Sequence, residues 1–184
     1  MNRRAEEVAR GLVGAGRLAR FDRSGLAFFD DSHEGAWRSF FACALAAPGF
    51  AILVLASLEP EEDVVRGLTV GLIAYAVEVA LFPLLMRHVA HGLERLERWP
   101  LFVAAANWSI IIQLAYHLMA LVAFELVPAP FGGYVALSFF GLALLYAWYI
   151  ARVALDIAGM QAAGVVALSL VISIALSHLS RAMA

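Results

Sequence analysis

Five long apolar blocks occupy most of this chain and constrain what it can fold into. They cover residues 39–58, 67–87, 101–127, 131–151 and 161–179. Each is close to the roughly 20 residues that a helix needs to cross a hydrocarbon core of about 30 Å. The pattern therefore predicts an all-α membrane protein with five transmembrane helices.

Composition supports a membrane location and excludes several functions. The chain is 63% apolar and 15% charged, whereas soluble domains are about 45–50% apolar and 25% charged. Its net charge of −2 argues against a nucleic-acid partner, which usually needs a clustered basic surface. The gaps between the blocks are too short to build an external active site, and no catalytic motif is present. We therefore expect no enzyme activity, no catalytic residue and no cofactor.

Arginine placement predicts how the chain is oriented in the membrane. The segments beside the blocks are in turn basic, acidic, basic, neutral and basic: residues 1–38, 59–66, 87–100, 128–130 and 152–160. Because arginine-rich segments stay on the cytoplasmic side, the N-terminus should be cytoplasmic and the C-terminus outside. Arg181 in the tail is the exception. The expected location is the inner (cytoplasmic) membrane of a bacterium.

The chain divides into an N-terminal segment, residues 1–38, and a five-helix transmembrane bundle, residues 39–184. The N-terminal segment repeats small apolar residues at helical spacing, with Arg10, Arg17 and Arg20 on other faces. This pattern predicts an amphipathic interfacial helix with its arginines near lipid headgroups. A solvated tail is the alternative.

A capping signal lies just before the first block. Asp31 and Glu34 are spaced as a capping box, with Asp31 as the N-cap, and Trp37 follows at the depth of an aromatic belt. The first membrane helix is therefore expected to begin near residue 32.

Polar residues inside the blocks are candidates for a special site, because an ionisable side chain in hydrocarbon costs about 2.5–3.5 kcal/mol. Glu78 and Gln113 should lie at matching depth near the midplane. Tyr75 shares a helix face with Glu78, and His117 shares one with Gln113. We predict a buried polar cluster of these four residues. It could serve as a proton or ion relay, or it could hold the second and third helices together.

Other patterns predict helix packing. Gly67 and Gly71 form a GxxxG pattern that permits close helix approach. Ser169, Ser173 and Ser177 form a small polar stripe suited to a tight helix–helix seam. His88, His91 and Glu94 could ligate a metal, but cations at a helix C-terminus explain the histidines equally well. No metal site is expected.

The chain resembles Yip1-domain membrane proteins over residues 35–180, mostly in topology. The stretch from Leu145 to Val165 is similar to that family's fourth span, short inner link and fifth span. The Asp-Leu-Tyr-Gly-Pro motif of the eukaryotic members is absent, so the resemblance implies a bacterial-type member. It implies no trafficking-GTPase partner and no functional residues.

These patterns together predict a non-catalytic scaffold, organiser or accessory subunit of a membrane assembly. Its expected partners are the lipid bilayer and other membrane chains, or further copies of itself. The alternative is a small transporter or channel component that uses Glu78, Gln113 and His117.

Overall fold

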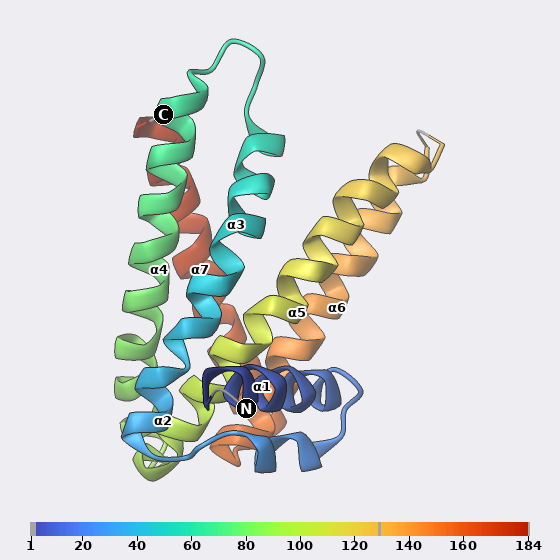
Figure 1. The fold of residues 1–184 in the computed structure, drawn as a ribbon. Coiled ribbons are helices and arrows are strands. Elements are labelled where there is room, and N and C mark those ends of the chain that lie inside the picture. The colour runs from blue at the N-terminus through green and yellow to red at the C-terminus, as the bar shows by residue number, and fades with distance from the viewer. Residues whose placement is uncertain (1–2, 129, 184) are drawn as a thin grey trace.

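The computed structural model describes residues 3–128 and 130–183, which form helices joined by short turns and links and contain no strand. Figure 1 shows long helices standing side by side, with a horizontal helix lying across them near one end. We call that end, which carries the N-terminus, the basal end, and the opposite end, which carries the C-terminus, the distal end. The expectation of an all-α fold is confirmed.

The five apolar blocks form the five long helices. They are α3 (Phe40–Ser57), α4 (Val64–Gly92), α5 (Trp99–Leu126), α6 (Gly132–Leu155) and α7 (Gly159–Met183). All five are long and apolar enough to cross a membrane, so the protein is a multi-pass membrane protein. Helices α4, α6 and α7 are longer than their apolar blocks, and the additional residues at their ends include polar ones. At the start of α4, the Asp63 side chain accepts hydrogen bonds from the backbone N–H groups of Val65 and Arg66.

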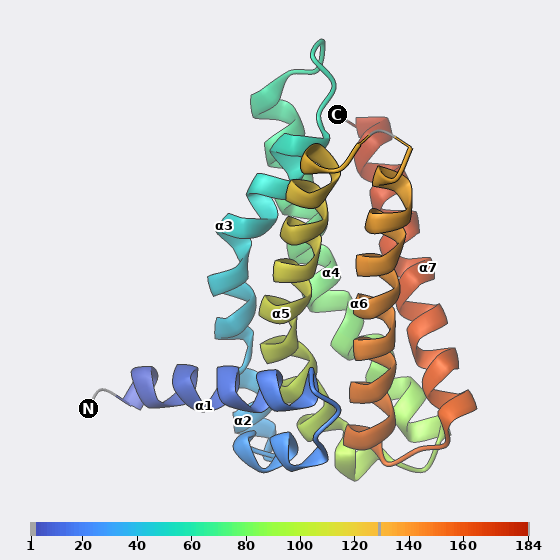
Figure 2. The ribbon, with the colours of Figure 1, turned by 90° about the vertical axis from the view of Figure 1, so that its right-hand side faces the viewer.

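The five spans are arranged as a ring. Helix α3 packs on α4 and α5, α6 packs on α5 and α7, and α7 packs on α4. Figure 2 shows α6 and α7 side by side, and Figure 1 shows α5 and α6 leaning away from α3 and α4 toward the distal end. The ring is therefore tightest at the basal end.

Near the basal end, the N-terminal helix α1 (Arg3–Leu18) lies across α5 (Figure 1). The Trp108 indole covers Gly11 so closely that a Cβ there would lie 2.1 Å from the ring. The Tyr146 hydroxyl of α6 donates to the Ala15 carbonyl at 2.8 Å. A short 3-10 helix, η1 (Arg23–Phe28), packs beneath α1. Much of the apolar face of α1 therefore contacts protein.

The first membrane helix is preceded by a separate short helix, α2 (His33–Arg38). Its N-cap is Ser32, whose hydroxyl accepts from the backbone N–H of Gly35 at 3.0 Å. The expectation that Asp31 is the cap was wrong, because the next residue provides the accepting side chain. The helix is interrupted at Ser39, which is buried and donates to the Ala36 carbonyl at 2.6 Å.

Arg38 ties three basal segments together. Its guanidinium contacts Asp30 at 2.6 Å, Glu34 at 2.7 Å and Glu7 of α1 at 3.3 Å. Hydrogen bonds from the side chain and backbone of Ser32, and then from Arg38, hold the pKa of the Asp30 carboxyl below its usual range. Arg38 therefore has acidic partners within the protein.

Candidate functional site

A cavity of about 830 Å³ lies inside the ring and is lined by residues of all five spans. Glu59, Glu62 and Arg181 stand at its distal end, and Phe102 and Ile150 line it toward the basal end. The cavity exists because the spans contact their neighbours around the ring, while α4 and α5 on opposite sides touch little. Its size falls in the range of about 300–1,000 Å³ that is typical of ligand sites.

One face of α4 carries the central part of the cavity wall. Tyr75, Glu78 and Phe82 are spaced at three and four residues, so they lie on one helix face, and all three line the cavity. The Tyr75 hydroxyl donates to the Cys43 carbonyl of α3 at 2.8 Å. Its ring stacks on Phe50 with centroids 4.5 Å apart. Tyr75 is thus fixed against α3, and Glu78 stands beside it in the cavity.

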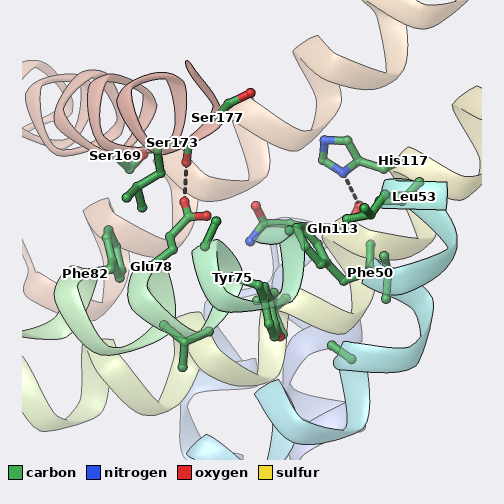
Figure 3. Close-up of a pocket in the computed structure, with 18 of the residues that line it drawn as sticks. Phe50, Leu53, Tyr75, Glu78, Phe82, Gln113, His117, Ser169, Ser173 and Ser177 are labelled. Carbon is green, nitrogen blue, oxygen red and sulfur yellow. Dashed lines mark hydrogen bonds between the residues drawn. The ribbon is translucent and has the colours of Figure 1, made fainter. Parts of the chain in front are cut away.

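Glu78 joins α4 to α7. Its Oε1 atom accepts a hydrogen bond from the Ser173 hydroxyl, as Figure 3 shows. Ser169 and Ser177 line the same wall one turn away on either side, and the Ser169 hydroxyl donates to its own helix at the Val166 carbonyl. The serine stripe predicted to form a helix seam therefore lies where α7 packs on α4, and it also lines the cavity.

The opposite wall carries Gln113 and His117 of α5. In Figure 3 the Gln113 amide and the Glu78 carboxyl face each other across the cavity. The His117 Nδ1 atom lies 2.7 Å from the Gln113 backbone carbonyl, so that contact stays within α5. The four residues of the predicted polar cluster line one cavity, but Tyr75 bonds to α3, Glu78 bonds to α7, and the contact of His117 with Gln113 stays within α5. They surround a space instead of filling it.

The basal part of the cavity has a polar group that sequence reasoning missed. The buried Asn107 amide of α5 lines the cavity and donates to the Ser39 hydroxyl at 2.9 Å. An amide inside a membrane span is costly unless it is hydrogen-bonded, so its presence within the third block was an available signal. Phe50 and Phe82 gave no such signal, because an aromatic residue in a span most often faces lipid or core.

The two predicted packing glycines lie against α3. A Cβ on Gly67 would stand 2.6 Å from the Leu58 side chain, and one on Gly71 would stand 2.9 Å from Val54. Both glycines also line the cavity. Their missing side chains let α3 and α4 approach closely at the distal end.

The predicted interfacial residues are all exposed near the basal end. They are Arg10, Arg17, Arg20 and Trp37. Trp37 is 76% exposed and its ring lies beside Phe40. Arg17 donates to the Ser24 hydroxyl at 2.9 Å and lies over the Phe28 ring, so it contacts η1 within the protein.

The cavity has few ionisable groups, and most are acidic. Three carboxyl groups, Glu59, Glu62 and Glu78, face one guanidinium, Arg181, and one imidazole, His117. Across residues 3–128 and 130–183, no three His, Cys, Asp or Glu side chains come together as a metal site would require. What the arrangement offers is one central carboxyl group between apolar and hydroxyl-bearing walls.

Comparisons with protein-family models, curated proteins and solved structures found no match. The resemblance to Yip1-domain proteins therefore stays a prediction.

Proposed function

We propose that the protein binds a small organic solute in its central cavity, as a small transporter or a component of one. The observation that carries the proposal is that the intramembrane polar residues line a space of about 830 Å³. Polar groups in a span are costly. A set that surrounds a cavity is better suited to binding a solute than to holding helices together.

The proposal includes an orientation. We place the protein in a bacterial inner membrane, with the basal end in the cytoplasm and the cavity open to the outside. The arginine pattern of the gaps supports this orientation. Exposed Leu12 and Val13 of α1 would then meet the lipid surface, together with Trp37.

A scaffold or accessory role was the first expectation from the sequence, and the cavity favours the alternative. A scaffold needs complementary outer faces, whereas Glu78, Gln113, His117 and Ser173 all point inward. Association with other chains stays a prediction, because the large apolar side chains exposed on the spans suit lipid as well as a partner chain.

The proposal is tested by filling the cavity. Ala74 of α4 lines the cavity, and Ala76, two residues along the same helix, is exposed and outside it. We expect small solutes from a mixed panel to raise the melting temperature of the wild type and of Ala76→Phe in nanodiscs. Ala74→Phe should remain folded by circular dichroism and lose the shift.

Native mass spectrometry of the same samples provides a second readout. A small molecule that co-purifies with the wild type and with Ala76→Phe, but not with Ala74→Phe, would support the proposal. Equal behaviour of the two phenylalanine variants would contradict it, since only one of them occupies the cavity.

A further inference from the structure

We propose that the solute is a lipophilic organic cation, with a protonated or quaternary amine on an aromatic or branched apolar body. This inference rests on the proposed solute-binding function and concerns the same cavity. Three properties of the cavity support it: the sign of its charge, the aromatic rings beside Glu78, and its apolar walls.

The charge of the cavity favours a cation. Three carboxyl groups line it against one guanidinium, and the guanidinium, Arg181, stands at the distal end with Glu59 and Glu62. Glu78 lies alone in the middle, about 14 residues or 21 Å along α4 from Val64. At that depth the low dielectric strengthens attraction between opposite charges. An anion would meet Glu78 without a guanidinium at that level.

The carboxyl group has room for a second interaction. Oε1 accepts from Ser173, and in Figure 3 the other oxygen points to the side of Gln113, across the cavity. A carboxylate has about four lone-pair sites. A cation can therefore contact Glu78 while the link to α7 stays in place.

Aromatic rings flank this position on both sides. Phe50 and Tyr75 stack at 4.5 Å on one side, and Phe82 pairs with Phe102 at 6.0 Å on the other. All four rings line the cavity. Cations bind the faces of such rings, and more strongly when desolvated. A carboxyl group between two aromatic pairs is therefore a suitable receptor for an organic ammonium group.

The remaining walls fit an apolar body. Ile110, Leu114, Ile150, Val165 and Val166 line the cavity from α5, α6 and α7. A small hydrated metal cation would gain nothing from these surfaces, whereas a lipophilic cation would bury its carbon atoms against them.

The experiment compares three phenyl-bearing probes of similar size and different charge. Tetraphenylphosphonium is the cation, triphenylphosphine oxide is the neutral probe and tetraphenylborate is the anion. Binding is measured by equilibrium dialysis against the full-length protein in zwitterionic nanodiscs, with binding to empty nanodiscs subtracted. We expect saturable binding of the cation, at least about tenfold tighter than that of the neutral probe, and no saturable binding of the anion.

Two variants locate the binding. Glu78→Gln should weaken the cation by about tenfold or more and leave the neutral probe unchanged. Glu61→Gln, in the exposed α3–α4 link outside the cavity, should bind as the wild type does. If Glu78→Gln does not fold, the order of the affinities of the three probes for the wild type still tests whether the cavity prefers a cation.

The outcomes separate this inference from the function on which it rests. Saturable binding of the cation and the neutral probe with equal affinity, or tighter binding of the anion, overturns the cation proposal and leaves solute binding intact. Absence of saturable cation binding also overturns it. Solute binding itself is judged by Ala74→Phe and Ala76→Phe, whatever the probes do.

Discussion

At the scale of single residues, the hydrogen bond from Ser173 to Glu78 is the contact that joins the proposed site to the packing of α4 on α7. Ser173→Ala removes the donor and leaves Glu78 less well satisfied, so the protein should lose about 1 kcal/mol of stability. The measurement is the midpoint of unfolding in a mixed-micelle titration. Ser177→Ala, one turn away on the same wall, is the control and should change stability by less. A larger loss in Ser177→Ala would show that the bond to Glu78 does not stabilise the fold.

A second prediction at this scale concerns Asp30 and pH. Its pKa is lowered from 3.8 in the folded protein. The stability that ionised Asp30 contributes is therefore present above that value and is lost as pH falls through the lower folded pKa. The wild type should melt higher than Asp30→Asn at pH 7, and the difference should shrink as the pH is lowered below 3.8. Asp31→Asn is the matched control, because it removes the exposed neighbouring carboxyl group, which makes none of the contacts of Asp30 with Ser32 and Arg38. A difference in melting temperature between the wild type and Asp30→Asn that widens toward low pH would contradict the predicted direction of the pH dependence.

At the scale of elements, the docking of α1 depends on the absence of a side chain at Gly11. A methyl group there would lie 2.1 Å from the Trp108 ring, whereas nothing lies within 4 Å of the same group on Gly16. Gly11→Ala should cost about 1–3 kcal/mol through overpacking. Gly16→Ala should be neutral or stabilising by up to about 1 kcal/mol, because alanine favours a helix.

Thermal melting of the two alanine variants beside the wild type checks this prediction, since both changes are chemically identical and lie in one helix. Equal melting temperatures for the variants would mean that α1 is not held against α5 by this contact. A loss confined to Gly11→Ala would support α1 as part of the folded bundle.

The apolar face of α1 could contact either lipid or the rest of the protein. Sequence periodicity predicted an amphipathic helix, and α1 is present with Arg10 and Arg17 exposed, while Arg20, also exposed, lies two residues beyond its end. The periodicity could not say whether the apolar face meets lipid or protein, because both are apolar surroundings. Ala15 and Leu18 are fully buried, so much of that face is covered by the bundle, while Leu12 and Val13 remain exposed.

At the scale of the whole molecule, the position of the cavity and the proposed orientation make one prediction together. Ser177 lines the distal half of the cavity. In a Cys43→Ala background, Ser177→Cys should react with a membrane-impermeant cationic thiol reagent added outside intact cells. Ser138→Cys on α6, exposed and outside the cavity, should face lipid and react little, because a thiol in hydrocarbon does not ionise.

Labelling is followed by the mass of the purified protein. Reaction of Ser177→Cys only when the reagent is added to inverted vesicles would reverse the orientation. Equal reaction of Ser138→Cys and Ser177→Cys from outside would show that reactivity does not report the cavity.

The amino-acid sequence alone was enough to predict the number of spans, their approximate ends and the helical character of the chain. Each of these depends on local properties: about 20 apolar residues in a row can cross the hydrocarbon only as a helix. The predicted first block, residues 39–58, differs from α3 (Phe40–Ser57) by one residue at each end. The matching depth of Glu78 and Gln113 followed from helix rise alone, and both line one cavity.

Whether the polar faces of the spans enclose a cavity or pack in a seam depends on how the five helices pack together. The spans are apolar on nearly all sides, so their sequences do not specify how each helix is rotated about its axis. Ser169, Ser173 and Ser177 could equally fill a tight seam or line a space. The ring of contacts around α3, α4, α5, α6 and α7 turned them inward. That outcome depends on how side chains far apart in the chain fit together, such as Gly71 against Val54 and Gly11 against Trp108, and such fits can be judged only once the helices are packed.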